Sequence, residues 1–381
     1  MSDVFGELIL AQPATSAMAT PDIDAAGLET FFSRELDADV VETEVIHDGL
    51  NLSLAVSTAE TERAFVLRRP NKFRRRSTFN GVAQEYGVLE RLRDTAVDAP
   101  EPVLLCEDDS VVGDPFLVMT HLDGEAVPLG SDLPERFRNR TARREVATRL
   151  VNSLTDLHAV ETEPFADVCD RRSVREQVDR IVEQFDDATS ATDRENAPLR
   201  RVADWLRENA PADSRTALVH GDYRPGNVLF ADADRPEIAG VLDWETAFLG
   251  DPLVELGYLL LRWRDDGDPT PALGGIRSRH PDADEDVLAD LEAMNDRGLA
   301  PFTSDPGSPS RRDLVGRYEE RTETAFENER FYRAFAAFVL ATVWEDLHRH
   351  RIETGEESSW EPYIDYMTET ATGVVDGEFP L

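Results

Sequence analysis

Two apolar runs that frame a polar loop constrain this chain more than any other feature. The first run ends at Val219 and is followed by His-Gly-Asp and, five residues after Asp222, by Asn227. A second apolar run, residues 238–242, ends at Asp243. The pattern predicts two short strands, each followed by side chains that can bind a metal ion or carry a proton. Taken singly, Asp and Asn residues usually form turns and caps, which is the simpler interpretation.

The charge balance argues against some classes of partner. The 381 residues include 77 acidic and 40 basic side chains, which gives a net charge of −37. Nucleic acids and anionic membrane surfaces are bound through basic patches, so neither is an expected partner. The acids are spread along the chain, and Lys72 is the only lysine. This composition is typical of halophilic proteins, because molar salt shortens the Debye length to about 3 Å and screens self-repulsion.

Cysteine usage and hydropathy indicate a cytoplasmic protein. Only Cys106 and Cys169 are present, which suits a reducing compartment and no disulfide framework. The apolar stretch 5–10 is too short for a signal peptide, and no run approaches about 18 apolar residues. We therefore expect no membrane segment, and the oligomeric state stays open.

The order of predicted elements favours an α+β fold with a small sheet first and helices after it. Residues 1–20 are expected to be disordered, and 22–36 and 80–92 to form amphipathic helices. From residue 145 onward the pattern changes to long helices, one of them with a capping box at Ser173. Alternating residues predict the strands of a small antiparallel sheet at 40–46, 49–56, 64–68, 103–106 and 115–120.

The polar loop resembles a known catalytic core. His220-Gly221-Asp222, then Asn227, then a strand that ends in Asp243-Trp244-Glu245 are similar to the aminoglycoside phosphotransferase family, with its choline-kinase-like relatives. That family shares the two-lobed protein-kinase-like fold. The resemblance covers about residues 46–353 and implies ATP- and Mg²⁺-dependent phosphorylation of a hydroxyl group on a small molecule. A protein kinase is not expected, because the Asp-Phe-Gly signal is absent.

The resemblance gives roles to the polar residues of this core. Asp222 would be the base that accepts the proton of the acceptor hydroxyl. Arg224 would lie near the transferred phosphate. Asn227 and Asp243 offer hard oxygen ligands, which suit Mg²⁺.

Other polar residues have structural interpretations. His220 is expected to hydrogen-bond the loop, and His158 to make a structural hydrogen bond. Asp251 is expected to cap a helix, and Trp244 to pack in the interior. Glu245 would help on the metal or substrate side.

The expected phosphate-binding cation lies in the first half of the chain. Strand 64–68 occupies the place of the kinase strand that carries a lysine, and here the position is Arg68, with Arg69 beside it. Either guanidinium could grip phosphate bidentately, and the sequence leaves the choice open. Glu85 resembles the glutamate that pairs with this cation, although a solvated helix acid is the simpler interpretation.

Two further segments would contact the nucleotide. Residues 48–53 stand where kinases have a glycine-rich loop, but they contain one glycine. The backbone of Asn51 and Ser53 would still cover the phosphates. The backbone from Thr120 to Leu122 would form the hinge that binds the adenine edge. The choice between ATP and GTP and the number of metal ions stay open.

The resemblance also implies a division of the chain. Residues 21–122 would form the small nucleotide-binding lobe, and 123–381 the helical lobe. The helical lobe would contain the catalytic loop 218–230, the metal segment 238–251 and an irregular insertion at 265–312, with one short helix at 287–294.

Three stretches narrow the resemblance to one subgroup. They are similar to the kinase domain fused to some acyl-CoA dehydrogenases, a subgroup linked to hydroxy acids or their acyl-CoA forms. A small-molecule acceptor of this kind is expected, and an antibiotic is not. The stretches are 65–70, 84–89 with 106–108, and 317–322 with 331–335.

Two rival functions stay open. A non-catalytic nucleotide-binding regulatory module would suit the arginine at position 68 and the glycine-poor loop, but the intact Asp222, Asn227 and Asp243 argue against it. A helical binding protein without nucleotide is the third interpretation. Failure of Mg-ATP to raise the melting temperature at high salt would favour that one, since ligands that bind only the native state stabilise it.

Overall fold

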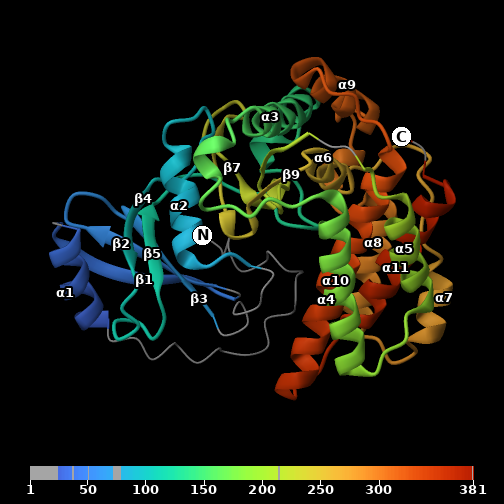
Figure 1. The fold of residues 1–381 in the computed structure, drawn as a ribbon, viewed down its shortest axis with the longest axis horizontal. Helices are drawn as coiled ribbons and strands as arrows, with labels where there is room; N and C mark the ends of the chain where they lie inside the picture. The colour runs from blue at the N-terminus through green and yellow to red at the C-terminus, as the bar shows by residue number, and fades with distance from the viewer. Residues whose placement is uncertain (1–24, 37, 50, 72–78, 213–214, 380) are drawn as a thin grey trace. The chain divides into compact units, whose positions relative to one another are not determined.

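The described part of the chain folds into two compact units (Figure 1). The computed structural model describes residues 25–36, 38–49, 51–71, 79–212, 215–379 and 381. The sheet unit consists of the described residues of Met1–Leu129 with Glu163–Cys169 and Pro225–Ala247. The helical unit consists of the described residues of Gly130–Thr162, Asp170–Arg224 and Phe248–Leu381.

The sheet unit is built on a five-stranded antiparallel sheet with the strand order β1-β2-β3-β5-β4 (Figure 1). Helix α1 (Ala25–Glu35) packs on β1, and helix α2 (Val82–Leu92) packs on β4 and β5. The strands are β1 Val40–Asp48, β2 Asn51–Thr58, β3 Phe65–Pro70, β4 Pro102–Cys106 and β5 Phe116–Thr120.

The core of this unit lies between α1 and the sheet. Leu28 and Phe32 of α1 cluster with Leu67 and Phe116 of the strands, and all four are at most 2% exposed. The rings of Phe32 and Phe116 meet edge to face with centroids 6.3 Å apart. Such ring pairs contribute about 0.5–1.5 kcal/mol beyond their buried area. This packing holds β3, which carries Arg68, in the middle of the sheet.

A small hairpin in the sheet unit brings Asn227 and Asp243 to the same end of a strand pair. Strand β7 (Val228–Phe230) pairs with β8 (Ile238–Val241), with Val228 opposite Val241. The pairing extends one step further, because Leu242 N donates to Asn227 O at 2.8 Å. Asn227, just before β7, and Asp243, just after β8, are therefore neighbours across the hairpin.

The helical unit is packed around α10 (Glu329–Thr354), which contacts α4, α5, α6 and α11. The contact with α6 depends on a glycine, because a Cβ atom on Gly257 would lie 2.7 Å from Tyr332 O. A short strand pair, β6 (Ala217–Val219) with β9 (Phe248–Gly250), belongs to the same unit. The remaining helices are α3 Arg140–His158, α4 Val174–Thr192, α5 Ala197–Asn209, α6 Leu253–Leu260, α7 Leu273–Arg279, α8 Glu285–Arg297, α9 Arg311–Thr322 and α11 Glu361–Asp376.

Most elements predicted from periodicity are confirmed. The five strands and two helices predicted up to Thr120 are present with shifted ends. Helix α4 begins with the predicted capping box, in which Ser173 Oγ accepts from Glu176 N at 3.3 Å and Glu176 Oε2 accepts from Ser173 N at 2.8 Å. The predicted disordered stretch 1–20 and Lys72 lie outside the described residues. Within the described residues, no helix is both long enough and apolar enough to span a bilayer.

The insertion 265–312 was expected to be irregular around one short helix at 287–294, and the structure has that helix as part of α8 together with a further helix, α7. The insertion contains the whole of α7 and of α8 and a short 3₁₀ turn at Pro301–Ser304. Gly274 and Gly275 obscure α7 in the sequence, because each glycine lowers helix propensity by about 1 kcal/mol relative to alanine. No prediction covered β9 or α11.

Candidate active site

Arg68 lies within an acidic cluster in the sheet unit. The residue is 8% exposed, and its Nη2 atom pairs with Asp243 Oδ1 and, at 2.6 Å, with Glu245 Oε2. Its Nε atom lies 3.4 Å from Glu85 Oε1. Burial alone would lower the pKa of Arg68, but the charges of the three carboxylates outweigh burial and hold the pKa well above its ordinary value. One charged guanidinium therefore balances acids from separate parts of the chain.

Three elements position this cluster. Arg68 lies on β3 opposite Ser53 of β2, and Glu85 lies in the first turn of α2, where it is 1% exposed. Asp243 follows β8 in the left-handed region, with φ 74° and ψ 54°. A non-glycine residue there costs about 1–3 kcal/mol, and such strain is typical of functional sites.

Glu245 is a buried member of the cluster, and sequence reasoning left its role open. It is 4% exposed, and its Oε2 atom accepts from Asn51 Nδ2 at 2.8 Å. Asn80 N donates to Glu245 O at 2.7 Å, and Asn80 Nδ2 donates to Ala247 O at 2.8 Å. Asn51, predicted to act through its backbone, is thus joined to the acidic cluster through its side chain.

Arg69 is directed elsewhere. Its Nη1 atom donates to Val112 O, and its Nη2 atom donates to Asn71 Oδ1 at 3.2 Å. Successive side chains of a strand point to opposite faces, so Arg68 and Arg69 diverge. Of the two candidates, Arg68 is the one that shares a cluster with Glu85.

The turn between β1 and β2 is tied down by Asn71, which had no predicted role. Asn71 Nδ2 donates to Asp48 Oδ1 at 2.8 Å and to Gly49 O at 2.7 Å. Gly49 N donates to Asn51 O at 3.0 Å. Leu50 of the predicted phosphate-covering loop lies outside the described residues.

The two predicted hinge residues differ in which backbone groups remain available. Thr120 N donates to Glu101 O at 2.9 Å, and Thr120 Oγ1 accepts from Glu101 N at 2.9 Å. Among the residues that the structure describes, the backbone N–H and C=O of Leu122 have no hydrogen-bond partner. Leu122 therefore has both groups available to a ligand.

Asn227 and Asp243 provide an amide oxygen and a carboxylate. Asn227 is 1% exposed, whereas the Asp243 side chain is 24% exposed. No group of three His, Cys, Asp or Glu side chains in the described ranges could hold a metal ion. Mg²⁺ is usually bound by one or two carboxylates together with water and substrate phosphates. The donor set therefore fits a magnesium ion that shares its coordination with a nucleotide, rather than a structural metal.

Asp222 and Arg224 lie in the helical unit and pair with each other. Arg224 Nε donates to Asp222 Oδ2 at 3.1 Å and to Oδ1 at 3.2 Å. Arg224 is buried, whereas the Asp222 side chain is 27% exposed and accessible. Asp222 N donates to His220 Nδ1 at 3.2 Å, which confirms that His220 hydrogen-bonds the loop.

Glu255 on α6 supports the same loop, and sequence reasoning missed it. Its Oε2 atom accepts from His220 N at 3.1 Å, and its Oε1 atom accepts from Gly221 N at 2.7 Å. His158 Nε2 lies 3.0 Å from Glu255 Oε2, and His158 Nδ1 lies 2.9 Å from Tyr318 OH. The structural role predicted for His158 is confirmed. Glu255 is the single acid in the otherwise apolar helix α6, and this pattern could have indicated its buried role.

Asp251 and Trp244 have the structural roles that were predicted. Asp251 Oδ1 accepts from Leu253 N at 2.9 Å, although the residue that caps α6 by backbone geometry is Pro252. Asp251 also accepts from Tyr332 OH at 2.6 Å. Trp244 is 1% exposed, and its Nε1 atom donates to the backbone of the preceding strand at 2.9 Å.

Comparisons with known proteins identify the family of this chain. Residues 43–293 match the model of the phosphotransferase enzyme family. Acyl-CoA dehydrogenase family member 10 from Mus musculus is 26% identical over 304 residues, which cover 78% of this chain and 25% of that protein. The chain thus spans about a quarter of the length of this relative.

Solved structures share the fold. A Ralstonia eutropha protein assigned to the aminoglycoside phosphotransferases has a TM-score of 0.68 and 21% identity, over 92% of this chain and 98% of that one. The GDP complex of aminoglycoside 2′-phosphotransferase-IIIa has a TM-score of 0.56 and 13% identity, over 92% of this chain and 99% of that one. At these identities the likeness shows the kinase-like fold alone. Because the family model matches most of its length, the chain belongs to the phosphotransferase enzyme family, which comprises small-molecule kinases.

Proposed function

We propose that the protein transfers the γ-phosphoryl group of ATP to a hydroxyl group of a small metabolite, with Mg²⁺ as the metal ion. The Arg68 cluster is the observation that carries the proposal. The cluster combines the buried cation Arg68 with Glu85 of helix α2 and with Asp243, the carboxylate proposed to bind the metal ion. Phosphoryl transfer requires these parts, because catalysis depends on placing phosphates and balancing their charge rather than on covalent chemistry.

The sheet unit would hold the nucleotide. The backbone of Leu122, which has no hydrogen-bond partner among the described residues, would bind the adenine edge, and Arg68 would bind the phosphates. Phosphate oxygens would compete with Asp243 for the guanidinium and release that carboxylate for metal binding. Asn51 and Ser53 would lie beside the phosphates. The GDP complex among the solved structures supports nucleotide binding by this fold.

The helical unit would supply the base. Asp222 would accept the proton of the acceptor hydroxyl as its oxygen forms a bond to the γ-phosphorus. The bond from that phosphorus to the bridging oxygen breaks, and ADP leaves. Arg224 orients the Asp222 carboxylate through its Nε atom and would face the transferred group. The metal ion, held by Asn227 and Asp243, would neutralise charge on the phosphates.

The acceptor class is a hydroxy acid or its acyl-CoA thioester. The resemblance to kinase domains fused to acyl-CoA dehydrogenases supports this class. The mouse relative, whose name refers to acyl-CoA, also supports it.

Acceptor-dependent formation of ADP tests the proposal. The panel would contain hydroxy acids, their CoA thioesters and aminoglycosides, with Mg²⁺ and molar KCl. We expect turnover with a member of the first two groups, and loss of turnover when EDTA removes the metal. Turnover with aminoglycosides alone would contradict the acceptor class. A melting temperature that Mg-ATP does not raise would contradict nucleotide binding.

A further inference from the structure

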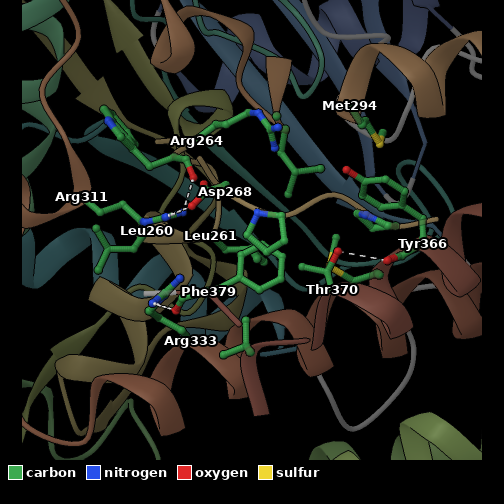
Figure 2. Close-up of a pocket in the computed structure, with 17 residues that line it drawn as sticks. Leu260, Leu261, Arg264, Asp268, Met294, Arg311, Arg333, Tyr366, Thr370 and Phe379 are labelled. Atoms are coloured by element: carbon green, nitrogen blue, oxygen red, sulfur yellow. Dashed lines mark hydrogen bonds and ion pairs between the residues drawn. The ribbon is translucent and has the colours of Figure 1, made fainter. Parts of the chain in front are cut away.

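A cavity in the helical unit has both cationic and apolar walls (Figure 2). Its volume is about 60 Å³, enough for a few water molecules or a small polar group. The charged residues of its lining are Arg264, Arg311 and Arg333, with Asp268 as the single acid. In a chain with a net charge of −37, a lining that carries three cations and one anion is unusual.

Two of these arginines already have carboxylate partners. Arg311 pairs with Asp268 and, at 3.2 Å, with Asp265. Arg333 Nη1 donates to Glu329 Oε2 at 3.1 Å. Burial lowers the pKa of Arg333, and the nearby charge of Arg311 lowers it further. Arg311 and Arg333 are therefore both held by carboxylates beside the cavity.

Arg264 and Tyr366 are different, because neither side chain has a polar partner among the residues that the structure describes. In the described part of the chain, the Arg264 guanidinium and the Tyr366 hydroxyl make no hydrogen bond or ion pair with protein. Both residues line the same cavity. Burial raises the pKa of Tyr366 to about 12, although the charge of Arg264 opposes the shift. In Figure 2 their side chains approach the same space from opposite sides.

The backbone holds Arg264 in this position. The residue at 298 is a glycine with φ +76°, and a Cβ atom there would lie 2.8 Å from Arg264 Cβ. The absence of a side chain at Gly298 therefore allows the Arg264 stem to pack against the chain beside the cavity.

We propose that this cavity binds a small organic carboxylate with a short apolar tail. Arg264 would donate two parallel N–H groups to the carboxylate, and Tyr366 would donate its hydroxyl to one oxygen. Met294 and Val374, which line the cavity, would contact the tail. The arginines exclude a cation, and the apolar wall disfavours a fully hydrated inorganic anion. The proposal does not depend on the proposed phosphoryl transfer.

This site is tested by calorimetric titration of the full chain with butanoate and 3-methylbutanoate at constant ionic strength. Butanamide, which has a similar shape and no charge, is the control ligand. We expect the native protein to bind the carboxylates and not the amide. Arg264→Gln is expected to weaken carboxylate binding about tenfold or more, because it removes a charge-assisted pair. Tyr366→Phe is expected to weaken it about fivefold, the effect of one neutral hydrogen bond.

Arg277→Gln is the matched control. It removes the same charge from the surface of α7, where Arg277 pairs with Glu292 outside the cavity lining. Carboxylate affinity is expected to stay native in this variant. Equal binding of amide and carboxylate, or native affinity in a folded Arg264→Gln protein, would overturn the proposal. Absence of any binding heat at carboxylate concentrations up to about 10 mM would overturn it as well.

Discussion

At the scale of single residues, Arg68 pairs with three carboxylates of the sheet unit. It balances Glu85 and Glu245, which are 1% and 4% exposed, together with the less buried Asp243. A buried acid without its cation is costly, so removal of this one side chain affects folding as well as ligand binding.

Two replacements of Arg68 distinguish the effect of its charge from the effect of its planar guanidinium group. Arg68→Met is expected to lower the free energy of unfolding by about 3–5 kcal/mol, because it leaves buried carboxylates unpaired. Arg68→Lys keeps the charge but lacks the planar fork, so we expect a smaller loss of stability and about tenfold weaker Mg-ATP binding. Urea unfolding and calorimetric titration measure the two effects. Arg69→Lys is the control, and a greater loss of nucleotide affinity in that variant would contradict the assignment to Arg68.

Asp251 gives a pH dependence with a definite sign. Burial raises its pKa above the ordinary value of 3.8, although Tyr332, Leu253 and His158 partly oppose the shift. The folded state therefore holds this proton more tightly than the unfolded chain does. The penalty on stability is absent below pH 3.8, grows as the pH rises from there to the folded pKa, and is constant at higher pH.

Asp251→Asn removes this titration while keeping an oxygen acceptor for Leu253 N. The free energy of unfolding of the variant, relative to the native protein, should rise between pH 4 and neutral pH, as measured by urea unfolding at each pH. A difference that does not change with pH would contradict the expected raised pKa.

At the scale of elements, α6 positions the catalytic loop through Glu255. The carboxylate accepts from His220 N and Gly221 N and pairs with His158. In Glu255→Gln one acceptor oxygen becomes an NH₂ group that faces a donor. We expect kcat to fall about 10²-fold while the KM for ATP stays native, because a small displacement of Asp222 is enough to misplace the base.

Steady-state kinetics with both substrates measure this split between kcat and KM. Glu208→Gln is the matched control, because Glu208 is an exposed residue of α5. A native kcat in a folded Glu255→Gln protein would mean that loop geometry does not depend on this contact.

Local signals made some elements predictable and left others hidden. Strands β1 to β5 and the capping box of α4 follow from alternation and from Ser173 with Glu176, and all are present. Helix α7 was missed because Gly274 and Gly275 weaken its pattern. Strand β9 is too short for periodicity to detect, since it has three residues.

Some residues of the candidate site could also be predicted from the sequence, whereas others could not. The spacing of Asp222, Asn227 and Asp243 is local and could be recognised in the sequence. The contact of Asn51 with Glu245 joins residues 194 positions apart, and the contact of His158 with Glu255 joins residues 97 positions apart. Pairs of this kind leave no periodic signal, so only the folded structure shows which acid meets which partner.

At the scale of the whole molecule, the net charge of −37 predicts salt-dependent stability. In dilute buffer, like charges repel over about 30 Å, whereas in molar salt the range falls to about 3 Å. We therefore expect the melting temperature, followed by circular dichroism, to rise from dilute buffer to molar KCl. NaCl of equal ionic strength should have the same effect if screening is the cause. Identical melting curves in dilute buffer and molar KCl would contradict the halophilic interpretation.

The central claim is tested most directly by transfer of label from γ-labelled ATP to hydroxy acids and hydroxyacyl-CoA thioesters. The assay compares the native protein with a variant that lacks the proposed base, Asp222. The native protein should transfer label to an acceptor, and Asp222→Asn should reduce the rate at least about 10²-fold. Asp204→Asn, a change of the same chemistry at an exposed position of α5, should leave the rate native. Native transfer rates in Asp222→Asn, or no transfer by a native protein that binds Mg-ATP, would contradict the account.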